Sequence, residues 1–254
     1  MQMTGPIAAA AAPGTSVGGP RGATATRNAR TGCMRAATGL LCLALAACAT
    51  TATGNSIAST STAAERETGW QSLFDGKTLD GWRANEHPDS FRVQDGRIVV
   101  KGERAHLFYT GPVQQHDFRD FELKLEVMTF PGANSGVYFH TIWQDEGWPG
   151  KGYEVQVNNT QSDPKRTAGL YAVQDNFKAP AADNTWFELK VRVEGKHVTT
   201  FVDGKPIADY TEPADPQRPA DMAGRVLGSG TIALQAHDPD SEVHYRNIRI
   251  RALP

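Results

Sequence analysis

The sequence predicts an all-β fold, a two-sheet antiparallel sandwich of the jelly-roll type, for residues 69–254. Short stretches of alternating apolar and polar residues recur throughout this region, turn residues separate them, and no long stretch has helical periodicity. Roughly a dozen such strands in a region of about 185 residues are typical of a sandwich of two sheets.

Two stretches alternate strictly, residues 121–127 (FELKLEV) and 187–193 (FELKVRV), so each is expected to turn one face to a core and one to water. Asp-Gly pairs at 95–96 and 203–204 lie between strand candidates and predict tight hairpins, in which glycine accepts a positive φ. Further strands are expected at 96–101, 137–142, 153–158, 198–202, 231–235 and 243–250.

The N-terminal part predicts export. The sequence Leu45-Ala-Ala-Cys48 follows the apolar run 40–45, an order typical of a bacterial lipoprotein signal with its lipidated cysteine. About ten apolar residues are too few to span a hydrocarbon layer of roughly 30 Å. Residues 1–47 are therefore expected to be a signal region.

Residues 1–33 lack periodicity, and a compact signal would start at Met34, which suggests a mis-assigned start. The alternative is a spare cysteine in a signal helix.

Residues 48–68 are expected to be the lipidated Cys48 and a flexible Ala/Thr/Ser-rich tether. The prediction is an exported lipoprotein, facing the periplasm or the cell surface, that touches the membrane only through its lipid anchor. Since Ala49, rather than Asp, follows the cysteine, the outer membrane is favoured.

The composition limits how the domain can be stabilised and which partners it can have. All three cysteines lie at or before position 48, so the domain that follows has no thiol for a disulfide and must be stabilised by its core. The formal net charge is −2, and no cluster of Lys and Arg occurs, so nucleic acid is not expected as a partner.

Several strands carry polar side chains where a sandwich needs an apolar face. If the strand 243–250 is regular, Arg246 shares the core-facing side of Ile248. In 137–142 both faces are semi-apolar, so that strand is expected to be covered on both sides, with His140 on the same side as Tyr138. The Glu154, Gln156 and Asn158 face of the strand 153–158 is either solvated or a site.

A polar sheet face with aromatic rings suits sugar recognition, because hydroxyls need polar partners and the C–H face of a sugar stacks on a ring. Trp143, Trp148, Tyr153 and Tyr171 could supply rings. Trp186 and Tyr138 are better explained as core residues, and a lone histidine on a strand is usually structural.

Five motifs occur in order: 72–82 (SLFDGKTLDGW), 134–140 (NSGVYFH), 152–158 (GYEVQVN), 169–171 (Gly-Leu-Tyr) and 245–250 (YRNIRI). Together they resemble the 3-keto-disaccharide hydrolase family over residues 70–253. The resemblance implies a jelly roll of the concanavalin A-like or LamG-like type and action on 3-keto-glycosides. It also implies a partner sugar 3-dehydrogenase that first oxidises the sugar.

The chemistry of such a substrate differs from ordinary glycoside hydrolysis, which uses two carboxyl groups and an oxocarbenium-like transition state. A ketone at C3 acidifies the proton on C2, and removal of that proton allows loss of the group on C1, followed by hydration. This route needs a base near C2, a group that stabilises the enolate oxygen and an acid for the leaving oxygen.

The resemblance implies roles for individual positions. Glu154 is expected to be the base or a metal ligand, Arg246 to lie near the developing negative charge, and His140 or His237 to be the acid/base partner. His237 belongs to the segment Gln235-Ala-His237, which resembles the family's Gln-x-His, whereas many relatives carry Arg at position 140. The expected substrate-binding residues are Gln156, Tyr171, Trp143, Trp148, Asn134 and Asn158.

A bound Ca²⁺ or transition metal is compatible with Glu154, His237, Asp238 and Asp240, although no ligand spacing demands one. The alternative to an enzyme is a non-catalytic glycan-binding envelope lipoprotein, because fold alone does not decide function. A third hypothesis is a structural or assembly role, in which the polar face is merely solvated.

Overall fold

The computed structural model describes residues 68–254. Cys48, the expected signal region and nearly all of the expected tether lie outside the described residues. In the described part, three short 3-10 turns accompany the strands, and no helix is long and apolar enough to cross a membrane. The strands are β1 (Gln71–Ser72), β2 (Trp82–Ala84), β3 (Phe91–Gln94), β4 (Arg97–Val100), β5 (Ala105–Tyr109), β6 (Phe121–Thr129), β7 (Ser135–Thr141), β8 (Tyr153–Val157), β9 (Arg166–Leu170), β10 (Gln174–Asn176), β11 (Phe187–Glu194), β12 (His197–Val202), β13 (Lys205–Thr211), β14 (Thr231–Ala236) and β15 (Val243–Ala252).

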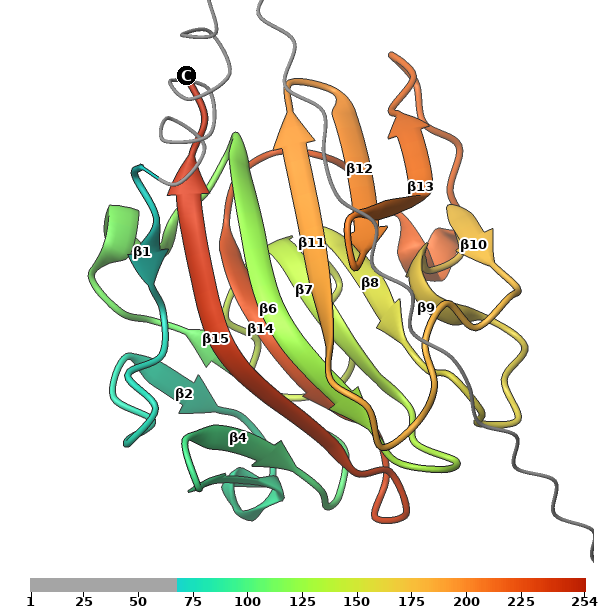
Figure 1. Cartoon of the computed structure of the whole chain (residues 1–254). Coiled ribbons are helices and arrows are strands. Elements are labelled where there is room, and N and C mark those ends of the chain that lie inside the picture. The colour runs from blue at the N-terminus through green and yellow to red at the C-terminus, as the bar shows by residue number, and fades with distance from the viewer. Residues whose placement is uncertain (1–67) are drawn as a thin grey trace, which may run out of the picture. The chain divides into compact units, whose positions relative to one another are not determined.

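These strands form two antiparallel sheets, as the sequence predicts (Figure 1). The eight-stranded sheet has the order β13-β12-β11-β6-β15-β4-β3, and β1 also pairs with β15. The seven-stranded sheet has the order β10-β9-β8-β7-β14-β5-β2. Strands that are neighbours in a sheet are often distant in sequence, as β14 between β7 and β5 shows, and this is the pattern of a jelly-roll sandwich.

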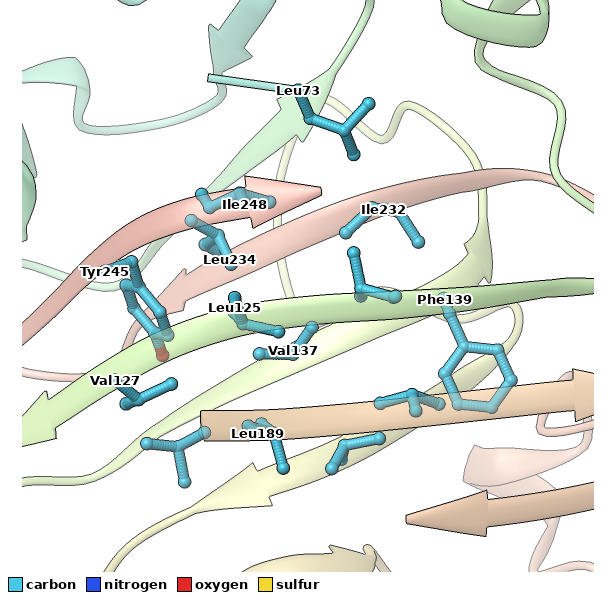
Figure 2. Packing of buried hydrophobic residues seen from close by; sticks show 14 of the residues in the cluster. Leu73, Leu125, Val127, Val137, Phe139, Leu189, Ile232, Leu234, Tyr245 and Ile248 are labelled. Atoms are coloured by element: carbon cyan, nitrogen blue, oxygen red, sulfur yellow. The ribbon is translucent and has the colours of Figure 1, made fainter. Parts of the chain in front are cut away.

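The core lies between the two sheets. Leu125 and Val127 of β6 and Leu189 of β11 come from one sheet, and Val137 and Phe139 of β7 come from the other (Figure 2). Each of these side chains is at most 2% exposed. The strict alternation at 121–127 and 187–193 is confirmed, because the apolar residues of both stretches belong to this core and the intervening residues do not.

Both predicted hairpin turns are present. Asp95 and Gly96 have φ of 48° and 77°, and Asp203 and Gly204 have φ of 47° and 74°. Two consecutive residues with positive φ are the requirement of the type I′ turn, which Asp-Gly satisfies with little strain.

Strand β15 is not regular, so the prediction that Arg246 faces the core is wrong. Its register against β6 shifts between Arg246 and Arg249, and Asn247 has a φ of 51°. This bulge lets Ile248 reach the core, while the Arg246 side chain remains 40% exposed. On the outer side of the sheet the Arg246 Nε donates a hydrogen bond to Glu126 Oε2 at 2.6 Å.

A second irregularity corrects the prediction for β7. His140 has a φ of 55°, and the pairing of β7 with β14 is also irregular at this end. The His140 ring therefore packs against Phe121 and Phe139 of the core, with ring centroids 5.8 and 5.2 Å away, whereas Tyr138 faces away from it. Every residue of β7 is buried, which confirms that the strand is covered on both sides.

Candidate functional site

A cavity of about 450 Å³ lies on the outer face of the seven-stranded sheet. Residues of β7, β8 and β14 form its floor, and residues of the loops between strands form its walls. The lining residues are Asn134, Tyr138, Gln144, Gly147, Trp148, Pro149, Gly150, Glu154, Gln156, Asp163, Tyr171, Asp221, Met222, Arg225, Gln235 and His237.

The floor follows from strand register. Because side chains alternate along β8, Glu154 and Gln156 point away from the core that Val155 enters. Gln156 pairs with Gly136 on β7, and a Cβ at Gly136 would lie 2.7 Å from Glu154 Oε1. The glycine therefore provides the space that the Glu154 carboxylate occupies.

Glu154 forms a buried ion pair with Arg225. Arg225 Nη2 donates to Glu154 Oε2 at 3.1 Å, and the two side chains are 8% and 6% exposed. Gln235 Nε2 donates to Glu154 Oε1 at 3.2 Å and to the Tyr138 hydroxyl at 3.0 Å. Burial, aided by the negative charge of Glu154, raises the pKa of Tyr138 well above its usual value, so this hydroxyl stays protonated.

Three side-chain atoms around the cavity floor have no hydrogen-bond partner among the described residues. Within the described residues, Arg225 Nη1, Gln156 Oε1 and Gln235 Oε1 are buried and have no partner. Leaving such an atom unpaired costs about 1 to 3 kcal/mol. One donor and two acceptors on cavity-lining residues would match a ligand that carries hydroxyl and carbonyl groups.

His237 lies at the wall and is held by Asp238. Its Nδ1 is 2.6 Å from Asp238 Oδ2, which also accepts a hydrogen bond from Ser241 Oγ at 2.9 Å. Burial raises the pKa of Asp238, but the hydrogen bonds from His237 and Ser241 outweigh it, and the net pKa is below the usual value. A carboxylate at Nδ1 orients the imidazole and leaves Nε2 for proton transfer.

Two of the wall loops are joined by backbone. Gly152 N, at the end of the loop 142–152, donates to Gly224 O at 2.9 Å. A Cβ at Gly224 would clash with the Gly150 carbonyl oxygen, so only glycine permits this approach. Gln144 O in turn accepts a hydrogen bond from Asn85 Nδ2 at 3.0 Å, which ties the loop 142–152 to the end of β2.

The cavity brings together six of the residues expected from the sequence: Asn134, Trp148, Glu154, Gln156, Tyr171 and His237. Arg246 is not among them, since it lies on the other sheet beside Glu126. His140 is also elsewhere, because Arg119 O is 2.8 Å from its Nε2 and Gly228 N donates to its Nδ1 at 3.2 Å.

The other two expected substrate-binding residues have structural contacts. The Trp143 ring packs beside Phe108 with centroids 5.3 Å apart and under the Arg83 guanidinium at 3.8 Å. Asn158 Nδ2 donates to the carbonyl oxygens of Asp163 and Lys165, at 3.1 and 2.9 Å, and so shapes the loop after β8.

Each residue expected to bind a cation is paired with another side chain or exposed to solvent. Within residues 68–254 no three His, Cys, Asp or Glu side chains form a group that could hold a metal ion. Glu154 is paired with Arg225, His237 with Asp238, and Asp240 is exposed.

Three of the cavity residues that surround Glu154 were not predicted as site residues: Arg225, Gln235 and Tyr138. Arg225 lies in an irregular loop without any periodic pattern, so the sequence carries no signal for it. Gln235 stands two residues before His237, and the Gln-x-His segment could have indicated it. The sequence predicts Tyr138 as a core residue, because a tyrosine on a strand with apolar neighbours is usually part of the core.

The two-sheet sandwich and its polar, aromatic-lined cavity define a β-sandwich of the galectin-like and concanavalin-like class. Within that class, the chain belongs to the family described as the 3-keto-alpha-glucoside-1,2-lyase-like domain, which matches residues 69–251. It is also 32% identical, over 78 residues, to a 3-keto-disaccharide hydrolase of Bacteroides thetaiotaomicron. That match covers 28% of this chain and 27% of the relative.

Solved structures support the fold. A Parabacteroides distasonis protein, provisionally assigned as a glycosyl hydrolase, matches with a TM-score of 0.63 and 20% identity, covering 75% of this chain and 97% of that one. A Bacillus subtilis protein of unknown function with a galectin-like fold matches with a TM-score of 0.53 and 12% identity, covering 72% of this chain and 94% of that one.

Proposed function

We propose that this protein cleaves 3-keto-glycosides by removing the proton on C2 and expelling the substituent on C1. The observation that carries the proposal is the combination, in one cavity, of the buried Glu154–Arg225 pair and the His237–Asp238 pair. Elimination needs a base, a stabilising positive charge and an acid, and these two pairs supply all three.

The steps follow from the groups present. Glu154 takes the C2 proton, and the electron pair moves onto the C3 oxygen as an enolate, which Arg225 stabilises. The enolate then re-forms the ketone, a double bond forms between C1 and C2, and the C1–O bond breaks. His237, held by Asp238 through its Nδ1, gives a proton to the leaving oxygen. Addition of water across the double bond yields the free 3-keto-sugar.

Arg225 replaces Arg246 in this scheme. Arg225 reaches the carboxylate of Glu154 and has a second guanidinium nitrogen without a partner among the described residues. In a buried site, a fixed positive charge is worth more than in water, because the surrounding dielectric constant is lower.

Variants of Glu154 test the proposal. Glu154→Gln should abolish release of 3-keto-glucose from a 3-keto-glycoside, by at least about a hundredfold, because an amide cannot take the C2 proton. Glu126→Gln is the matched control, since Glu126 also pairs with an arginine but on the other sheet. The assay is run with and without chelator. Release by Glu154→Gln at the wild-type rate would contradict the proposal.

The alternative function is glycan binding without catalysis. It is favoured by the exposed Trp148, at 44%, and by a fold shared with the sugar-bound lumenal domain of VIP36, which matches with a TM-score of 0.50 and 11% identity, covering 73% of this chain and 91% of that one. Calorimetry separates the two: a binding module loses affinity in Glu154→Gln and shows no turnover in the wild type, whereas the enzyme loses turnover and retains binding.

The chemistry of the substrate also bears on the setting of the enzyme. Because its substrate carries a ketone at C3, an enzyme that oxidises the C3 hydroxyl must act before it. We propose that this protein meets its substrate outside the cytoplasm, as a lipoprotein anchored at Cys48, and the motif at 45–48 supports this address.

A further inference from the structure

A group of polar side chains lies beside the cavity but does not line it. Glu86, Arg104 and His106, with Trp148 at the cavity wall, make up this rim cluster. Arg104 Nη2 donates to Glu86 Oε1 at 2.6 Å, and Glu86 Oε2 accepts a hydrogen bond from Gly147 N at 3.1 Å. Glu86 therefore links Arg104 to the loop that carries Trp148.

Trp148 is the centre of the rim cluster. Its ring centroid lies 5.6 Å from that of His106 and 5.5 Å from the Arg104 Cζ. Trp148 is nevertheless 44% exposed, and it lines the cavity. A large aromatic ring that is held in place and still open to solvent is the kind of surface on which a sugar ring stacks.

The rim cluster has hydrogen-bonding groups without partners. Arg104 Nε and both ring nitrogens of His106 are buried and unpaired among the described residues, and His106 as a whole is 0% exposed. Buried polar groups are nearly always paired in folded proteins, so this cluster is incompletely paired beside the exposed Trp148 ring.

The charges in and near the rim cluster do not favour a negatively charged ligand. The Arg104 guanidinium is balanced by Glu86, and Glu146 adds a further negative charge nearby. The Arg104 side chain is 42% exposed, so it can reach a ligand in solution. An uncharged ligand rich in hydroxyl groups fits such a compensated pair.

The rim cluster lies where the leaving group of the substrate is expected to bind. His237, the proposed acid for the leaving oxygen, has its ring centroid 5.4 Å from that of Trp148. A leaving group protonated by His237 would therefore emerge beside the indole. We propose that the rim cluster is a second sugar subsite, in which Trp148 stacks on the uncharged leaving sugar and the Glu86–Arg104 pair binds its hydroxyls. This inference rests on the proposed function.

The experiment compares two substrates of the same anomeric form, 3-keto-trehalose and methyl 3-keto-α-glucoside. Arg104→Met should lower the ratio of their kcat/KM values, disaccharide over methyl glycoside, about tenfold relative to the wild type, because hydrogen bonds to a charged group are lost only for the disaccharide. Arg97→Met is the matched control, since Arg97 also has an acidic partner and an unpaired buried Nε but lies on the other sheet.

An unchanged ratio in Arg104→Met would overturn the subsite. If that variant fails to fold, Glu86→Gln is measured in its place and judged by the same ratio. Should the wild type turn over neither compound, the proposed function fails, and calorimetry on the same two compounds then decides the subsite. Tighter binding of the disaccharide that Arg104→Met removes supports it, and equal binding of the two compounds overturns it.

Discussion

Glu154 and Arg225 form a charge pair that is nearly inaccessible to water, and this burial has two consequences. Removing either partner alone would leave an uncompensated buried charge, which typically costs about 3 to 5 kcal/mol. The pair also holds its charges in fixed positions before substrate arrives, so little reorganisation is needed during the reaction. Structure and chemistry therefore depend on the same two side chains.

His106 predicts a pH dependence of stability. Burial lowers the pKa of His106 from about 6.5 to about 3, so the folded protein keeps it neutral where the unfolded chain takes up a proton. Its contribution to stability is present above pH 6.5 and is lost as the pH falls toward 3. Between pH 6.5 and 4.5 the free energy of unfolding should fall by about 2 kcal/mol on account of this residue.

Urea unfolding of the wild type and of His106→Phe at both pH values measures this effect. The variant has no titratable group at this position, so its free energy of unfolding should fall by about 2 kcal/mol less than that of the wild type. Equal losses in the two proteins would show that His106 is not held neutral by burial.

Arg246 and Arg225 show where reasoning from single residues fails. Arg246 stands in a recognisable motif, and a regular strand would turn it toward the core; the bulge at Asn247 places it on the outer side instead. Arg225 stands in no motif, yet it reaches Glu154 across 71 positions in the sequence. An ion pair between a strand and a distant loop leaves no periodic signal.

At the scale of elements, the close contact between the loops at 142–152 and 223–230 shapes the cavity. Gly224→Ala should separate them, because the added Cβ would clash with the carbonyl oxygen of Gly150. Arg225, the next residue, would then shift relative to Glu154, and we expect kcat/KM to fall by about tenfold, equivalent to 1.4 kcal/mol.

Gly228→Ala serves as the control for Gly224→Ala. Gly228 lies in the same loop, but an added Cβ there meets no atom within 4 Å. Steady-state kinetics should therefore show a loss for Gly224→Ala and wild-type values for Gly228→Ala. Equal kinetics in both variants would mean that the loop contact does not position Arg225.

The strands were predictable because the alternation of apolar and polar residues shows which face of a strand packs against the core. Every predicted stretch became a strand, from β4 to β15, with bounds that differ by one or two residues. The bulges were not predictable, since Asn247 and His140 are ordinary residues to find in a strand and their positive φ values depend on neighbouring strands.

At the scale of the whole molecule, the two-sheet sandwich places its cavity on the outer face of one sheet. The polar face of β8 was recognisable, and the sequence alone left open whether it was solvated or a site. Glu154 and Gln156 are 5% and 2% exposed, so the face is covered by loops. Only the folded chain shows this cover, because the loops that provide it, such as those before β8 and before β14, are far apart in the sequence.

The most direct test of the central claim is the isotope at C2 of the product formed in D2O. Elimination followed by hydration takes the C2 hydrogen away and returns one from solvent, so the first 3-keto-glucose released should carry deuterium at C2. Incubation of free 3-keto-glucose with the protein gives the background exchange. Deuterium above that background, absent with Glu154→Gln, is the predicted result. Release of 3-keto-glucose that keeps its C2 hydrogen would contradict proton abstraction and show direct hydrolysis instead.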